Sequence, residues 1–225
     1  KPDFSEAHSD LGVMYQDRGE FQKAIAHYKQ AIQADSHFIE AYTNFGVALN
    51  ALNRTAEAIR TLQRGLDLQP DHPETLFNLG VIYQQQKRNQ QAIIQYQLAV
   101  AADPNYPAAY NNLGVALQHN KQYDAAFEMF FKALEVDPQH CDAHFNLANG
   151  YRSRQRFTKA IDHYRQAIAI APPDKSFRAR VNLAITLQET KRWQEATELI
   201  LQSLPLFSGN QKQRLEILQQ QIPRL

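Results

Sequence analysis

Small residues return at a fixed interval of 34 positions along most of this 225-residue chain. One series consists of Gly12, Gly46, Gly80 and Gly114, and Ala148 continues it. Three further series keep the same interval: Ala24, Ala58, Ala92, Ala126 and Ala160; Ala31, Gly65, Ala99, Ala133 and Ala167; and Pro70, Pro104, Pro138 and Pro172. Self-similarity at a fixed period of this length is the signature of a repeat architecture, in which identical small units stack on one another.

Each repeat is predicted to contain two helices. In the third repeat, the segment 74–86 carries apolar residues on one helical face, and a second apolar stripe follows before Pro104. A hairpin of this size cannot bury a core alone, so the hairpins must stack, and the predicted fold is an all-α solenoid. We place the repeats at 5–38, 39–72, 73–106, 107–140, 141–174 and 177–210, with a two-residue insertion at Lys175–Ser176.

Both ends of the chain depart from the repeat. Residues 1–4 match the end of a preceding repeat, which suggests that the chain is a piece of a longer array. Residues 211–225 carry Leu215, Leu218 and Ile222 on one helical face, and we expect them to form a helix that caps the last hairpin.

The order of residue types within one repeat resembles the tetratricopeptide repeat (TPR) from residue 5 to 210. The fourth repeat shows the motif best, with Tyr110, Leu113, Gly114, Leu117, Tyr123, Ala126, Phe130, Ala133 and Pro138. This resemblance implies a right-handed superhelix in which the first helix of each hairpin lines the concave face. Because this fold hosts many partners, the resemblance alone does not specify a function.

One position on the predicted concave face is asparagine in five of the six repeats and aspartate in the first. The residues are Asp10, Asn44, Asn78, Asn112, Asn146 and Asn182. An asparagine amide both donates and accepts hydrogen bonds, so a row of them could clamp the backbone of an extended peptide. A similar asparagine ladder belongs to the TPR superhelix of O-linked N-acetylglucosamine transferase. The alternative is that these amides bond neighbouring helices and bind no ligand.

Hydrogen bonds alone would not give high affinity. Each contributes roughly 0.5–1.5 kcal/mol net, whereas ordering one peptide residue costs about 1–2 kcal/mol. Side-chain pockets must therefore supply the rest. Phe77 and Phe145, which directly precede ladder asparagines, are candidates for anchoring a ligand side chain, or they pack against the adjacent repeat.

Charged residues on the predicted concave face change sign along the chain. Acidic residues gather in the first three repeats (Glu6, Asp10, Asp17, Glu40 and Glu74), and basic residues appear in the last two (Arg152 and Arg178). Such a field could orient a ligand with a basic and an acidic end, or these are solvated charges without a binding role. The relatives that hold acidic chaperone tails use basic residues where this chain has Ser9, Val13, Glu74 and Asn78, which argues against that ligand.

Composition and motifs argue against several other functions. The 24 basic and 23 acidic residues nearly balance, which disfavours nucleic acid as a partner, and no apolar run is long enough to span a membrane. His140, Cys141 and His144 lack the paired spacing of a zinc site, and no catalytic or phosphate-binding motif is present. We therefore expect no catalytic residue, metal or cofactor, and a cytoplasmic location.

The leading hypothesis is a non-enzymatic scaffold that binds an extended peptide or a partner protein through the asparagine ladder. A second hypothesis makes the array the substrate-recruiting arm of a larger enzyme, such as a glycosyltransferase. A third is a homo-oligomer that assembles through the exposed repeat ends, because the first repeat should offer an apolar face.

Overall fold

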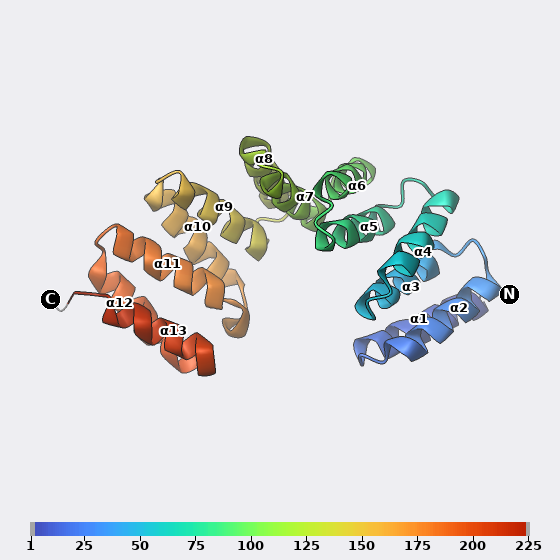
Figure 1. The fold of residues 1–225 in the computed structure, drawn as a ribbon, viewed down its shortest axis with the longest axis horizontal. Helices are drawn as coiled ribbons and strands as arrows, with labels where there is room; N and C mark the ends of the chain where they lie inside the picture. The colour runs from blue at the N-terminus through green and yellow to red at the C-terminus, as the bar shows by residue number, and fades with distance from the viewer. Residues whose placement is uncertain (1–2, 224–225) are drawn as a thin grey trace. The chain divides into compact units, whose positions relative to one another are not determined.

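The computed structural model describes residues 3–223, and within that range it contains thirteen α-helices, two short 3-10 helices and no strand (Figure 1). The chain forms two compact units, residues 1–122 and 123–225. Lys1 and Pro2, which we assigned to the end of a preceding repeat, and residues 224–225 of the predicted cap lie outside the described residues.

The first unit is built from helical hairpins. Its helices are α1 (Asp3–Asp17), α2 (Phe21–Ala34), α3 (Ile39–Ala51), α4 (Thr55–Leu68), α5 (Pro73–Gln85), α6 (Asn89–Ala102) and α7 (Pro107–His119). Helices α1–α2, α3–α4 and α5–α6 pack as pairs, and the second helix of each pair also packs against the first helix of the next. This contact pattern is that of a solenoid, in which each hairpin buries its apolar face on its neighbours.

The second unit repeats the same arrangement. Its helices are α8 (Tyr123–Val136), α9 (Cys141–Ser153), α10 (Phe157–Ile170), α11 (Phe177–Glu189), α12 (Trp193–Ser203) and α13 (Gly209–Gln220), with 3-10 turns η1 (Pro173–Lys175) and η2 (Leu204–Leu206). Helices α9–α10 and α11–α12 form hairpins, and α10 packs on α11. The turn η1 lies at the two-residue insertion predicted from the sequence, directly before α11.

The tight turn inside each hairpin contains one residue in the left-handed conformation. In the third hairpin this is Lys87, with φ of 60°, and the backbone N–H of Arg88 donates to the carbonyl oxygen of Tyr83 at 2.9 Å. This bond closes the Schellman motif that ends many helices. The first hairpin uses Gly19 with φ of 75°, whereas the later hairpins use Asn53, Gln155 and Lys191 at the same place.

Paired helices approach closely at the glycines of the 34-residue series. A Cβ atom on Gly80 would lie 2.6 Å from Cε1 of Tyr96, and one on Gly46 would lie equally close to the side chain of Leu62. Tyr96 is fully buried there, and its hydroxyl donates to Oε1 of Gln84 at 2.7 Å. The repeated glycine therefore makes room for the large side chain of the facing helix.

Helix α13 closes the end of the second unit. Leu215 and Leu218 are buried in a cluster with Phe207 and Ile200, and Ile222 packs against the same cluster. Among residues 3–223, every helix is too short or too polar to span a lipid bilayer.

Candidate functional site

The ladder asparagines lie on the first helices of the hairpins. In the first unit, Asn44, Asn78 and Asn112 stand on α3, α5 and α7, and all three are half-buried. These helices contact one another in order, α3 with α5 and α5 with α7. Equivalent positions on touching helices bring the three amides onto one side of the unit.

The amides in the first unit retain hydrogen-bonding capacity. Nδ2 of Asn78 donates to the carbonyl oxygen of Glu74 in its own helix at 2.8 Å, which uses one of its two N–H groups. Oδ1 of Asn112 accepts a long bond of 3.3 Å from Nδ2 of Asn111. The side chain of Asn44 and Oδ1 of Asn78 have no hydrogen-bond partner among residues 3–223.

In the second unit, Asn146 and Asn182 stand on α9 and α11, which contact each other, and both are half-buried. Nδ2 of Asn182 donates to Oδ1 of Asn149 at 2.8 Å, across the two helices. This ladder amide is thus partly engaged by a neighbouring helix, which is the alternative that the sequence left open. Asp10, the acidic member of the series, is exposed on α1.

The two phenylalanines that precede ladder asparagines pack within the hairpins. The Phe145 ring is only 8% exposed, and the guanidinium of Arg178 lies over it at 4.8 Å from the ring centroid. Phe77 is half-buried, with ring centroids 5.0 Å from Tyr106 and 5.8 Å from Tyr96. The interpretation of Phe145 as an exposed anchor is therefore wrong, because the arginine of the next repeat covers it, and Phe77 also takes the packing role.

The charged residues of the predicted concave face differ in whether their charge is neutralised by an ion pair. Glu40 is exposed on α3, and Glu74 is exposed with one oxygen 3.5 Å from Nε2 of His72. Arg152 instead forms a two-pronged ion pair with Glu189, at 2.9 and 2.5 Å. This bond raises the pKa of Arg152 and lowers that of Glu189. Because the pair is neutral overall, Arg152 does not supply the unopposed positive charge that the sequence suggested.

The residues around Cys141 make hydrogen bonds within and between helices. Nδ1 of His140 accepts from the backbone N–H of Ala143 at 3.2 Å and so caps α9. The Cys141 thiol donates to the carbonyl oxygen of Ala167 at 3.4 Å, and burial raises its pKa. Within residues 3–223, no three His, Cys, Asp or Glu side chains cluster as a metal site would require.

Two histidine pairs escaped the sequence analysis. Nδ1 of His8 lies 3.2 Å from Nδ1 of His27, and Nδ1 of His144 lies 2.9 Å from Nδ1 of His163. The signal was available, because both members of the second pair stand 136 residues, or four repeats, after those of the first. Burial first, and His144 second, lower the pKa of His163.

A polar hollow on the second unit also went unnoticed. It has a volume of about 460 Å³ and is lined by Asn149, Arg152, Ser153, Gln155, Phe157 and Glu189. Its signal in the sequence is a break in the repeat, since Asn149 takes a position that is aliphatic in the other five repeats (Val13, Val47, Val81, Val115 and Ile185).

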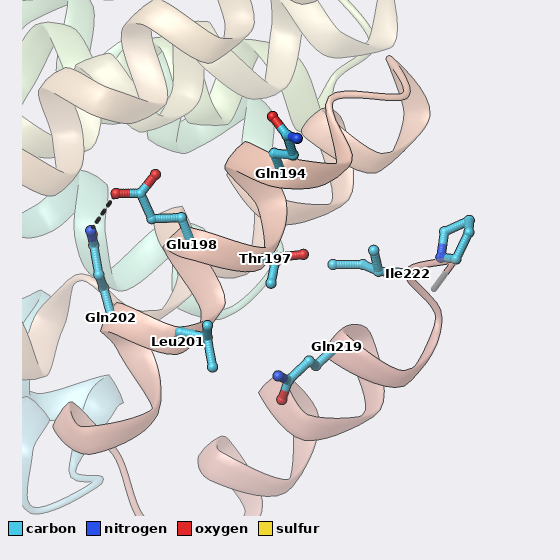
Figure 2. A pocket seen from close by; sticks show the side chains of 8 residues that line it. Gln194, Thr197, Glu198, Leu201, Gln202, Gln219 and Ile222 are labelled. Atoms are coloured by element: carbon cyan, nitrogen blue, oxygen red, sulfur yellow. Dashed lines mark hydrogen bonds between the residues drawn. The ribbon is translucent and has the colours of Figure 1, made fainter. Parts of the chain in front are cut away.

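A second, more apolar groove of about 570 Å³ lies between α12 and the C-terminal segment. Figure 2 shows Thr197 and Leu201 of α12 on one side of it, and Gln219 and Ile222 on the other. Gln194, Glu198 and Gln202 add polar groups to the lining, and Nε2 of Gln202 donates to Oε1 of Glu198 at 3.1 Å.

Comparison with solved structures finds proteins of the same fold. PilF of Pseudomonas aeruginosa has 19% sequence identity and a TM-score of 0.83, with 96% of this chain and 97% of that chain covered. MamA of Desulfovibrio magneticus RS-1 has 22% identity and a TM-score of 0.63, covering 75% and 95%. YrrB, described as a TPR protein with an unusual peptide-binding site, has 24% identity and a TM-score of 0.57, covering 73% and 85%. At these identities the likeness establishes the fold alone.

Comparison with curated protein sequences finds no match. Sequence profiles of the tetratricopeptide repeat, however, match residues 15–74, 54–117 and 106–172, which together run from residue 15 to 172. These matches agree with the 34-residue period, the hairpins and the similar structures. The chain belongs to the tetratricopeptide repeat family.

Proposed function

We propose that this protein binds an extended segment of a partner protein along the first helices of its hairpins, with the asparagine ladder holding the backbone of that segment. The observation that carries the proposal is the spare hydrogen-bonding capacity of Asn44 and Asn78 on touching helices. A half-buried amide with unused groups can bond a peptide N–H or C=O with little reorganisation.

The ladder sets the register of the bound segment and contributes part of its affinity. Three amide contacts at about 1 kcal/mol each contribute about 3 kcal/mol, which corresponds to roughly a hundredfold in the dissociation constant. Peptide binding is also consistent with the similarity to YrrB, which is described as a TPR protein with an unusual peptide-binding site. We further propose that the chain has no catalytic role and acts in the cytoplasm.

The test is a peptide selected on the wild-type protein from a random linear library. Its dissociation constant is measured by fluorescence anisotropy with the wild type and with Asn44→Ala/Asn78→Ala/Asn112→Ala. We expect roughly a hundredfold weaker binding in the variant. Alanine is the better helix former, so circular dichroism should show an intact fold. Equal affinities of the wild type and the triple variant would rule out binding by the ladder. The control is Gln97→Ala, an exposed substitution on α6 that should leave the affinity unchanged.

A second candidate function is self-association, and the exposed face of α1 favours it. Leu11 is 39% and Met14 is 51% exposed, whereas Leu79 and Ile82, which occupy the same repeat positions in α5, are 3% and 2% exposed. In the later repeats, the second helix of the preceding hairpin packs against this face. We propose that this exposed face of α1 binds the groove beside α12 (Figure 2) on a second copy of the chain, in a head-to-tail contact.

Light scattering over a concentration range tests this contact. The wild type should grow in mass with concentration, and both Leu11→Glu and Leu201→Glu should stay monomeric, because each destroys one side of the contact. Mixing the two variants leaves one intact pair of surfaces, so a dimer should form. A monomeric wild type at high concentration, or no dimer in the mixture, contradicts the head-to-tail contact.

A further inference from the structure

The hollow on the second unit is built around a side chain that breaks the repeat pattern. Oδ1 of Asn149 accepts two hydrogen bonds, from the hydroxyl of Tyr164 at 2.6 Å and from Nδ2 of Asn182 at 2.8 Å. These bonds occupy its oxygen and fix the orientation of the amide. The N–H groups of Asn149 donate to no residue between 3 and 223, so they remain available as donors in the hollow.

A neutral ion pair forms another part of the lining. Nε and Nη2 of Arg152 on α9 donate to the two carboxylate oxygens of Glu189 on α11. Two of the five guanidinium N–H groups bond Glu189, and each carboxylate oxygen can accept a further bond. The pair thus offers additional donors and acceptors side by side, with little net charge. The ring of Phe157 adds an apolar part to the lining.

We infer that this hollow binds the side-chain carboxamide of an asparagine or glutamine in the bound segment. Such a group needs donors for its oxygen, which Asn149 and Arg152 provide, and an acceptor for its N–H, which Glu189 provides. A ligand carboxylate has no N–H to donate to Glu189, so it would leave that acceptor of the lining unused. A ligand ammonium would leave the donors of Asn149 unpaired, and an aliphatic side chain would leave all of them unpaired.

This inference rests on the proposed function, because the carboxamide belongs to the segment bound along the first helices of the second unit, which carry the ladder residues Asn146 and Asn182. It adds sequence preference to a site that otherwise recognises only backbone. The hollow has a volume of about 460 Å³, which is ample for one side chain.

The experiment uses a selected peptide and variants of it in which each asparagine or glutamine is replaced, one at a time, by the corresponding acid and by leucine. Affinities are measured with the wild type and with Asn149→Val/Arg152→Gln. This double variant copies the third repeat, where Val81 replaces the asparagine and Gln84 accepts the hydroxyl of Tyr96. The Tyr164 hydroxyl therefore keeps an acceptor, and the fold should persist. Gln166→Val, an exposed change on α10, is the matched control.

With the wild type and with Gln166→Val, we expect one position in the peptide where either replacement weakens binding about tenfold. With the double variant, that preference should vanish while the unsubstituted peptide still binds. Selected peptides without a sensitive carboxamide, or a preference that survives in the double variant, would overturn the inference while leaving ladder-dependent binding intact. Failure of the library to yield any peptide would overturn the proposed function and this inference together.

Discussion

Replacing Gly80 by alanine should destabilise the protein, although alanine is the better helix former. The added Cβ would lie 2.6 Å from Cε1 and 2.8 Å from Cδ1 of Tyr96, which is fully buried. Overpacking of this kind costs about 1–3 kcal/mol. Displacing the ring would also weaken the bond from its hydroxyl to Gln84, worth about 1 kcal/mol, against a gain of about 1 kcal/mol in helix propensity. The net loss is about 2 kcal/mol.

The fifth repeat shows how the chain itself resolves this conflict. There Ala148 replaces the glycine, and the facing Tyr164 donates to Asn149, the residue directly after the alanine, rather than to a residue four positions after it. Gly80→Ala/Val81→Asn reproduces this arrangement in the third repeat. We therefore expect the second substitution to restore about 1 kcal/mol of the lost stability.

Thermal unfolding followed by circular dichroism and calorimetry measures both effects. For a chain of this length, a loss of 2 kcal/mol lowers the Tm by about 4–8 °C. Val81→Asn alone is the control, because it adds the amide while Gly80 still leaves room for the Tyr96 ring. A Gly80→Ala variant as stable as the wild type, or no recovery in the double variant, would refute the account of the close approach.

Four further substitutions test other parts of the fold. Lys87→Gly should raise stability by about 0.5–1 kcal/mol, because φ at this turn is 60° and glycine accepts that conformation without the penalty of a side chain. Gly19→Ala should lower stability by a similar amount, although the added Cβ would meet no atom within 4 Å, because φ of Gly19 is 75°. Tm values equal to that of the wild type would contradict this reasoning. The pKa of His163 is lowered in the folded state, so the unfolded chain binds more protons, and the free energy of unfolding should fall as the pH drops below about 6.5. His163→Gln should flatten this dependence in urea titrations at several pH values, and an unchanged slope would exclude the histidine pair as its source. Leu215→Ala should cost about 2–5 kcal/mol, since this side chain of α13 is fully buried in the cluster with Ile200 and Phe207, and a cost below 1 kcal/mol in chemical denaturation would show that the helix is not a stable cap.

The sequence predicts the helical hairpins well, because one period determines where apolar side chains recur. The spacing of Gly80 and Tyr96 follows from that period, and so does the first-helix position of Asn44, Asn78 and Asn112. These features depend on backbone geometry, which all repeats share, and a pattern repeated five or six times specifies it clearly.

Side-chain partners within the site follow less readily from the sequence. The guanidinium of Arg178 covers Phe145, and Arg152 pairs with Glu189. Both contacts join the fifth repeat to the sixth. Which partner a long side chain selects depends on differences of about 1 kcal/mol between competing contacts, and the repeat pattern contains no record of them. Asn149 did carry a signal, but it was a departure from the pattern rather than part of it.

The most direct test of the asparagine ladder replaces backbone rather than side-chain atoms of the ligand. Each amide of a selected peptide is N-methylated in turn, and the dissociation constant is measured with the wild type and with Asn44→Ala and Asn78→Ala. If the ladder holds the backbone, methylation at particular positions should weaken wild-type binding by about tenfold, and the effect at one such position should disappear in one of the variants. Binding that tolerates methylation everywhere, or a loss that is the same in wild type and variants, would contradict backbone recognition by these asparagines.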